Sequence, residues 1–185
     1  MKTVFFDIDT QLDFLYPAGA LYVPGAERIV PAIARLNRYA AQRGIPVVST
    51  ADAHLEDDVE FKTWPRHCVA GTGGADFHPD LVTSHLETVF SKGAHEAAYS
   101  AFDGRDEKGT PLAAWLRERG VDELDVAGIA TDYCVRATAI SAAGEGFATR
   151  VLLGLTAGVD PTTTAESIDA MRAAGAQVTG TPVER

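Results

Sequence analysis

The sequence is poor in cysteine, in basic residues and in long apolar runs. Its two cysteines, Cys68 and Cys134, allow one disulfide at most. The 16 Lys and Arg residues are outnumbered by 26 Asp and Glu, and the net charge of -10 argues against nucleic acid or an anionic membrane as a partner. No apolar run approaches the length of a membrane span, and the opening MKTVFFDIDT is typical of a strand rather than a signal peptide. We therefore expect a soluble cytoplasmic protein, where a reducing environment disfavours the disulfide.

The chain is long enough for one domain with a sizeable core. Its apolar fraction of 46% is ordinary for a globular protein, and we expect residues 1–185 to form a single domain. Expected strands span residues 3–8, 45–50, 88–91, 124–129, 149–153 and 176–179. Expected helices span residues 25–43, 112–119, 132–144 and 162–174. Strands this apolar are buried on both faces, which predicts a three-layer α/β/α fold with a doubly wound, mainly parallel sheet.

A stretch at about 52–86 interrupts the alternation of strands and helices. It has little periodicity but holds four of the five histidines, together with Phe61, Trp64 and Phe77. Irregular stretches of this length inside a compact domain are usually functional or disordered, and the aromatic content argues against disorder. We therefore expect a functional insertion here.

Polar side chains follow four of the expected strands. They are Asp9 after the first, Asp52 and His54 after the second, Lys92 after the third and Cys134 after the fourth. Ligands of open parallel sheets bind at the carboxyl ends of the strands. The sequence therefore predicts that a carboxylate, a metal-type pair, an amine and a thiol converge at one edge.

Cys134 is the candidate nucleophile. At the start of a helix, unpaired backbone N–H groups and the helix dipole favour a thiolate, and the N–H groups can also form an oxyanion hole. Asp9 could take the thiol proton and later protonate a leaving amine, while Lys92 stabilises both anions. The simpler explanations are a surface Lys92 paired with Glu96, and an Asp9 that caps a helix or turn.

Asp52 and His54 are the core of a candidate metal site. Residues two apart in extended backbone point the same way, so both could bind one ion. His67 would complete the site, with Glu60 as a fourth protein ligand. This donor set suits zinc, with iron or manganese as alternatives. The simpler explanation is that Asp52 and His54 only form hydrogen bonds within the loop.

Five separate segments resemble the nicotinamidases, within the isochorismatase-like cysteine hydrolase superfamily. They are DTQLDF with PAGAL near the start, DAH at 52–54, WPRHCV with GTGGA and FHP at 64–79, KG with YSAF at 92–102, and GIATDYCV at 128–135. The resemblance runs in order from the first strand to about Gly158. It implies a small-molecule amide substrate, with nicotinamide converted to nicotinate and ammonia through a cysteine thioester.

The resemblance also implies roles for individual residues. The implied catalytic triad is Asp9, Lys92 and Cys134; the implied metal ligands are Asp52, His54 and His67, with Glu60 where the family places a histidine or an acidic ligand. The metal is implied to hold the ring nitrogen of nicotinamide, between the rings of Phe14 and Trp64. A cis peptide is implied between Ile129 and Ala130, which turns the Ala130 and Cys134 amides toward the carbonyl oxygen of the substrate.

Two departures from the family pattern leave the substrate open. Leu12 stands where asparagine is usual, and His95-Glu96-Ala97 stands where smaller or aromatic residues are expected. Both are expected near the pocket, so a substituted ring or another amide could be accepted. Cys68 is interpreted as a buried structural thiol.

Two other functions compete with the amidase. One is a different reaction within the superfamily, on another amide or on a vinyl ether; such vinyl ether hydrolases generally lack the Asp-x-His and Trp-Pro-x-His group. The other is a non-catalytic binding protein, which would have no need of a nucleophile. The oligomeric state is left open, including a homo-oligomer.

Overall fold

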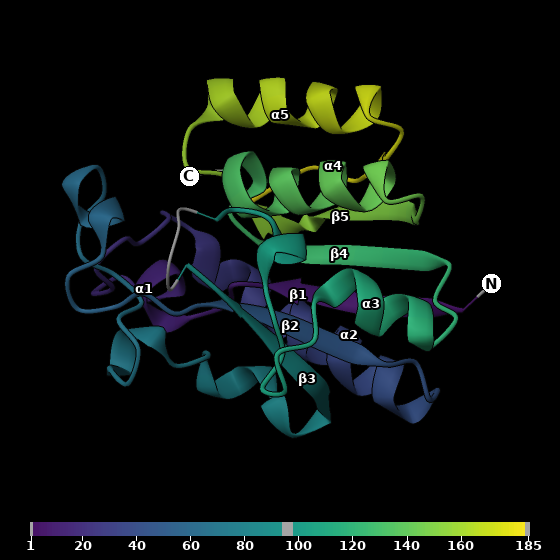
Figure 1. Cartoon of the computed structure of the whole chain (residues 1–185). Helices are drawn as coiled ribbons and strands as arrows, with labels where there is room; N and C mark the ends of the chain where they lie inside the picture. Colours follow the sequence, from purple (N-terminus) through teal and green to yellow (C-terminus); the bar gives the residue numbers. More distant parts are fainter. Residues whose placement is uncertain (1, 94–97, 184–185) are drawn as a thin grey trace.

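The computed structural model describes residues 2–93 and 98–183. Its strands are β1 (Thr3–Ile8), β2 (Val47–Asp52), β3 (Leu86–Lys92), β4 (Glu123–Ile129), β5 (Ala148–Ala157) and β6 (Gln177–Thr179). They form one sheet in the order β3-β2-β1-β4-β5-β6, and every pairing is parallel (Figure 1). The predicted α/β fold with a parallel sheet is confirmed.

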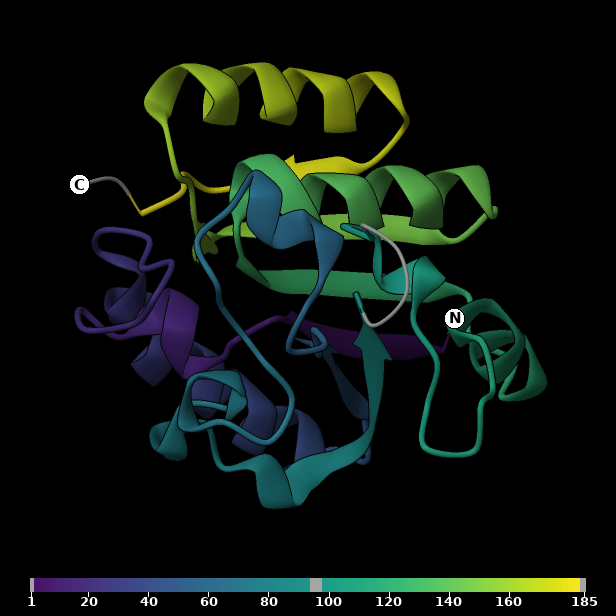
Figure 2. The same cartoon turned by 60° about the vertical axis from the view of Figure 1, so that its left-hand side comes forward.

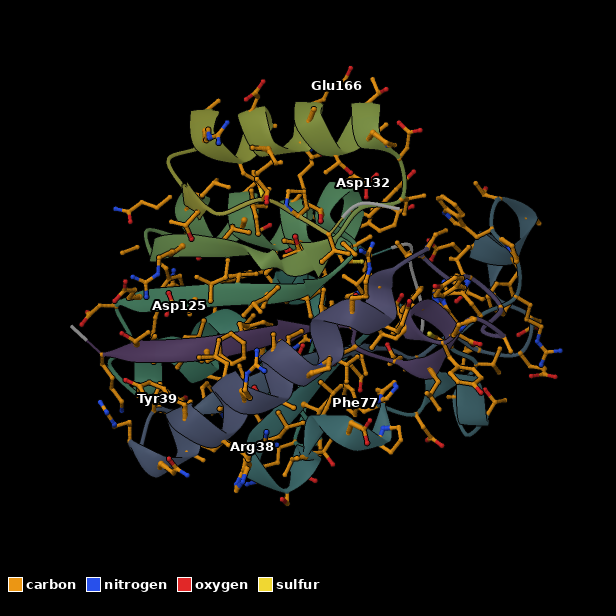
Figure 3. The ribbon with its side chains drawn as sticks, turned by 180° about the vertical axis from the view of Figure 1, so that it is seen from behind. Arg38, Tyr39, Phe77, Asp125, Asp132 and Glu166 are labelled. Carbon is orange, nitrogen blue, oxygen red and sulfur yellow. The ribbon has the colours of Figure 1, made fainter. Side chains whose placement is uncertain are left out.

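Helices cover both faces of the sheet. They are α1 (Leu12–Leu15), α2 (Val30–Gln42), α3 (Leu112–Glu118), α4 (Arg136–Gly144) and α5 (Pro161–Ala173). In Figure 1, α3 lies in front of the sheet and α2 behind it. Figure 3, seen from behind, shows α2 crossing the sheet, with Tyr39 on its outer side. Within the described residues, none of the helices combines the length and apolar character that crossing a bilayer requires.

Two apolar clusters, one on each side of the sheet, hold the layers together. The first joins β1 side chains such as Phe6 to α3 and α4, and the second joins Phe5 on the same strand to α2 and to Phe14 in α1. Successive strand residues point to opposite faces, so a central strand with apolar residues on both faces must be covered twice. This explains why the strands could be predicted as continuous apolar runs.

The edge where the strands end is also where the strand order reverses. The chain moves from β1 outward to β2 and β3, and then returns to β4 on the other side of β1. Such a reversal opens a crevice at the carboxyl ends of the two central strands, which is the usual ligand site of open α/β sheets. Asp9 follows β1 and Cys134 follows β4, so both lie at this crevice.

The predicted bounds of several elements were wrong by a few residues. The second strand ends at Asp52 rather than at Thr50, so this carboxylate belongs to the strand. The predicted helix over 25–43 begins with the 3-10 turn η1 (Ala26–Ile29), and the helix after β4 begins with the π-helical turn η7 (Thr131–Val135).

The irregular stretch after β2 consists of short turns that begin at the carboxyl edge of the sheet and run back to the start of β3. They are the 3-10 turns η2 (Val59–Lys62), η3 (Gly73–Ala75), η4 (Pro79–Leu81) and η5 (Thr83–His85). Figure 2 turns this edge toward the viewer and shows the blue segment over the ends of the strands. Single bridges connect His54 to Val69 and Gln11 to Phe77, so the stretch is tied to itself and to the loop after β1.

Candidate active site

Cys134 lies in the η7 turn directly after β4. The peptide bond between Ile129 and Ala130 is cis, as the resemblance implied, and the N–H of Val135 donates to the carbonyl of Ala130 at 3.1 Å. The turn places the thiol at the carboxyl edge of the sheet. Its side chain lines a pocket there, although the residue is only 7% exposed.

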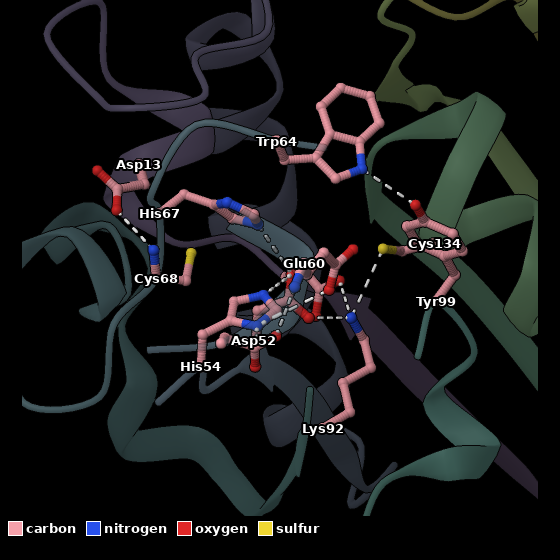
Figure 4. A network of polar contacts seen from close by, with 12 residues as sticks. Asp13, Asp52, His54, Glu60, Trp64, His67, Cys68, Lys92, Tyr99 and Cys134 are labelled. Carbon is pink, nitrogen blue, oxygen red and sulfur yellow. Dashed lines mark hydrogen bonds and ion pairs between the residues drawn. The ribbon is translucent and has the colours of Figure 1, made fainter. Parts of the chain in front are cut away.

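Lys92, the last residue of β3, joins the thiol to two carboxylates. Its Nζ lies 3.6 Å from Cys134 Sγ and 2.9 Å from Asp9 Oδ2, and it also donates a short hydrogen bond to Asp52 Oδ1 (Figure 4). The Lys92 and Asp9 side chains are fully buried. The two simpler explanations, a surface lysine and a capping aspartate, are therefore wrong. Glu96, the partner proposed in the first of them, lies outside the described residues.

Asp9 is held by the neighbouring strand. Thr50 on β2 donates its hydroxyl to Asp9 Oδ1 at 2.6 Å and accepts the Asp9 N–H at 3.2 Å. Asp9 has a φ of 49°, a left-handed conformation that a residue other than glycine seldom adopts. The second carboxylate oxygen is thus turned toward Lys92.

Buried charges control the protonation of this cluster. Burial disfavours the charge on Lys92, but Asp52 and Asp9 outweigh it and raise its pKa well above the ordinary value. Burial also raises the pKa of Cys134, with Lys92 opposing and Asp9 adding to the effect. Burial raises the pKa of Asp9 as well, against the charge of Lys92. Burial and the two carboxylates therefore favour the neutral thiol, although a helix start alone favours the thiolate, so the thiol needs a base, which is the role predicted for Asp9.

Asp52, His54 and His67 form a second cluster beside the thiol. Asp52 Oδ2 lies 3.8 Å from His54 Nε2 and 3.9 Å from His67 Nε2. The three residues are buried, and ligand atoms of all three lie within 4.8 Å of one another. His54 Nε2 is buried with no hydrogen-bond partner among the described residues, which an ion would supply. Two imidazoles and a carboxylate that converge in this way fit a divalent transition metal.

Other groups fix the orientation of both histidines. His54 Nδ1 lies 3.1 Å from Asp58 Oδ2, and His67 Nδ1 lies 2.7 Å from the carbonyl oxygen of Pro65. If each Nδ1 carries the proton and donates it, each Nε2 keeps its lone pair for a ligand. Asp58 was not singled out from the sequence; the only signal was an acidic residue four positions after His54.

Glu60 lies near Nδ1 of His54, whereas Asp52 faces Nε2 of the same ring. Its Oε2 is 3.8 Å from His54 Nδ1, and the residue also lines the pocket. Its predicted role as a ligand stays a prediction.

Asp52 connects the two clusters. One oxygen faces Lys92 and the other faces the histidines. Burial disfavours its charge, but Lys92 and His54 outweigh this and lower the pKa of Asp52 to about 2. Gln11, whose role was not predicted, holds Asp52 in place: its amide accepts the Asp52 N–H at 2.9 Å and donates to the Asp52 carbonyl at 2.8 Å.

The pocket in front of Cys134 has aromatic walls. Its lining residues include Phe14, Trp64, Tyr99, Tyr133, His67 and Cys134. The Trp64 indole N–H donates to the Tyr99 hydroxyl at 3.2 Å (Figure 4), and the Trp64 and Tyr133 rings meet edge to face at 5.4 Å. Phe14 and Trp64 were predicted, whereas Tyr99 and Tyr133 were not assigned to the pocket. A pocket of this kind suits a flat ring.

Three predictions at the margins of the site have different outcomes. Cys68 is fully buried and forms no disulfide with Cys134, as expected. Leu12, expected near the pocket, is not among its described lining residues; its N–H donates to the carbonyl of Asp76. His95-Glu96-Ala97 lies outside the described residues.

Known proteins are similar to this chain in both sequence and fold. The Isochorismatase domain family matches residues 3–182. A nicotinamidase/pyrazinamidase of Mycobacterium tuberculosis is 49% identical over 92% of this chain and 95% of its own length. The zinc complex of the Pyrococcus horikoshii pyrazinamidase superposes with a TM-score of 0.87 at 34% identity, over 97% of this chain and 99% of that one. An L. infantum protein solved with nicotinate superposes with a TM-score of 0.85 at 33% identity, over 96% and 92% of the two chains. The match spans nearly the whole chain in sequence and in structure, and the protein therefore belongs to the isochorismatase domain family.

Proposed function

We propose that this protein is an amidase that hydrolyses nicotinamide to nicotinate and ammonia through a thioester on Cys134. The observation that carries the proposal is the position of the thiol, with Lys92 and Asp9 on one side and the Asp52, His54 and His67 group on the other. A nucleophile with a base suits acyl transfer, and a metal-type donor set beside an aromatic pocket suits a ring with a nitrogen lone pair. The activity named for the M. tuberculosis relative and the nicotinate bound to the L. infantum protein agree with this chemistry.

In the first half of the reaction, Asp9 takes the proton of the Cys134 thiol. Its raised pKa makes it a stronger base than an ordinary aspartate. The Cys134 sulfur then forms a bond to the carboxamide carbon, and the carbonyl oxygen gains a negative charge beside the backbone N–H groups of Ala130 and Cys134. When the carbon–nitrogen bond breaks, Asp9 returns the proton to the leaving group, and ammonia departs.

In the second half, water replaces the sulfur. Asp9 takes a proton from the water, whose oxygen bonds to the thioester carbon. The carbon–sulfur bond then breaks, the sulfur regains a proton, and the acid is released as nicotinate. Lys92 remains charged throughout, because two carboxylates raise its pKa, and it stabilises each anionic stage.

Asp52, His54 and His67, with Glu60 as the fourth candidate, would hold one divalent metal ion. We propose zinc, with iron or manganese as alternatives. When bound, it supplies a Lewis acid for the ring nitrogen. Phe14 and Trp64 flank the ring, and they exclude water from the thiol.

The proposal extends to the setting of the reaction. We place the enzyme in the cytoplasm, in pyridine nucleotide salvage, and expect one domain over residues 1–185. Its partner is a small amide, and the net charge of -10 disfavours nucleic acid and anionic membranes.

An ammonia-release assay tests the proposal. Nicotinamide and pyrazinamide should be hydrolysed, whereas benzamide, which lacks the ring nitrogen, should react at least about 100-fold more slowly. Cys134→Ala should abolish turnover, and Cys68→Ala, its matched control at the other buried thiol, should retain it. Turnover by Cys134→Ala would disprove the thioester, and equal rates on benzamide would disprove ring anchoring through the nitrogen.

A metal assay tests the proposed metal separately. Protein purified without chelator should contain close to one ion per chain, and a chelator should lower turnover of nicotinamide. Full activity in metal-free protein would remove the metal from the proposal.

A further inference from the structure

Asp7 is a buried carboxyl that the proposed reaction does not use. It lies on β1, two residues before Asp9, and is 1% exposed. Its Oδ2 accepts a hydrogen bond from the Thr10 hydroxyl at 2.9 Å. Its Oδ1 is buried and has no hydrogen-bond partner among the described residues. A buried carboxyl with one unpaired oxygen costs stability. The hydrogen bond from Thr10 is therefore the contact that can give this residue a role.

The contact between Asp7 and Thr10 spans the bend that carries Asp9. Asp9 is in the left-handed region with a φ of 49°. The Gln11 N–H donates to the Asp9 carbonyl at 2.8 Å, which closes a tight turn around Thr10. The side-chain bond connects the strand before the bend to this turn after it. It therefore opposes relaxation of Asp9 to a more common conformation, which would turn its carboxylate away from Lys92.

The contact depends on a hydrogen bond more than on charge. The residues paired in register with Asp7 are Ser49 on β2 and Ala127 on β4, both uncharged. Burial raises the pKa of Asp7 to about 7; the Thr10 hydroxyl opposes this, and the charge of Asp9 adds to it. Near neutral pH a large fraction of Asp7 is therefore the uncharged acid, which can still bind Thr10.

We propose that Asp7 is a positioning residue for the reaction: its carboxyl holds Thr10, and Thr10 holds the bend that aims Asp9 at Lys92 and Cys134. The inference deepens the proposed function and rests on it. Asp7 and Thr10 are not among the described residues that line the pocket, so their role is to position Asp9 rather than to contact the substrate.

Substitutions that separate the hydrogen bond from the charge test this proposal. Thr10→Val removes the hydroxyl and keeps the shape, whereas Thr10→Ser keeps the hydroxyl. Asp7→Asn keeps an oxygen for Thr10 but cannot ionise. The matched control is Thr149→Val on β5, which removes another buried hydroxyl, one that donates to the carbonyl of Phe147. Circular dichroism and thermal unfolding establish that each variant is folded.

Steady-state kinetics on nicotinamide give the main readout. Thr10→Val should lower kcat by roughly 10- to 100-fold with KM within about twofold, because a displaced base slows chemistry without affecting ring binding. Thr10→Ser and, at pH 6.5, Asp7→Asn should stay within about threefold of the wild type. A wild-type kcat in Thr10→Val, or an equal loss in Thr149→Val, would overturn the proposal. Failure of Thr10→Ser to restore the rate would also overturn it.

A second readout separates this inference from the proposed function. If the wild type releases no ammonia from any amide, the proposed function fails, but Cys134 can still be alkylated with iodoacetamide. The alkylation rate at pH 7.5 should then differ at least about threefold between Thr10→Val and the wild type, because Asp9 faces the thiol. Equal rates in all variants would overturn the positioning role.

Discussion

At the scale of the residue, Asp7 should make stability depend on pH. In the folded protein its pKa is raised to about 7, whereas an unfolded aspartate titrates near about 3.9. The folded state therefore keeps a proton that the unfolded state loses, so this contribution is complete below pH ~4, falls as the pH rises to about 7 and then stays constant. Asp7→Asn should match the wild type near pH 4 and exceed its free energy of unfolding by on the order of 3–4 kcal/mol at pH 8. Urea unfolding at several pH values measures the difference; a difference independent of pH would contradict this assignment.

Lys92 is the residue whose loss should most damage the fold around the site. Lys92→Met would leave the buried carboxylates of Asp9 and Asp52 without their cation, and removing one partner of a buried ion pair costs about 3–5 kcal/mol. Arg150→Met is the matched control, because Arg150 pairs with Asp125 while 39% exposed, and such pairs contribute about 1 kcal/mol or less. Urea unfolding at pH 7.5 of chelator-treated proteins compares the two. Equal losses would show that burial adds nothing to the Lys92 pairs.

At the scale of the element, the segment after β2 is held by contacts that order the metal-type side chains. Asp13 in α1 accepts the N–H of Cys68 at 2.7 Å and of Ala20 at 2.9 Å. Gly74 packs against the same carboxylate so closely that a Cβ there would lie 2.2 Å from an oxygen. The neighbour of Cys68 is His67, so α1 fixes this histidine. The segment has little regular structure, and polar anchors of this kind take its place.

Asp58 should control the affinity of this segment for metal. Asp58→Ala removes the carboxylate beside His54 Nδ1, and loss of such a partner typically weakens metal binding 10- to 100-fold, so we expect a decrease of about that size. Asp57→Ala is the matched control, since Asp57 is the exposed acidic neighbour. Competition with a chromogenic chelator measures the dissociation constant for zinc in each variant. If both variants bind zinc like the wild type, Asp58 does not orient His54.

At the scale of the whole molecule, the sequence predicts the arrangement of strands and helices better than the individual contacts within the site. Continuous apolar runs identified the strands, and the rule that parallel strands share one carboxyl edge brought Asp9, Lys92 and Cys134 together. The contacts of Gln11 and Asp58 depend on the path of irregular backbone, which leaves no periodic signal. The protonation of Cys134 depends on burial and on charges from distant strands, which its position at a helix start does not reveal. The single domain stays a prediction.

Removal of metal should loosen one edge of the molecule and leave the central sheet unchanged. The side chains that would bind the ion lie at the end of β2 and in the segment after it, whereas the two apolar clusters lie on the faces of the sheet. A ligand that binds only the folded state stabilises it by about 2.7 kcal/mol at 100 times its dissociation constant. Chelation should therefore lower the melting temperature, while amide hydrogen exchange increases mainly in residues 53–72 and little in β1 and β4. Zinc should restore protection in the wild type but only weakly in His67→Ala. Equal acceleration throughout the sheet would mean that the metal supports the whole fold, and no acceleration in residues 53–72 would mean that the segment does not bind it.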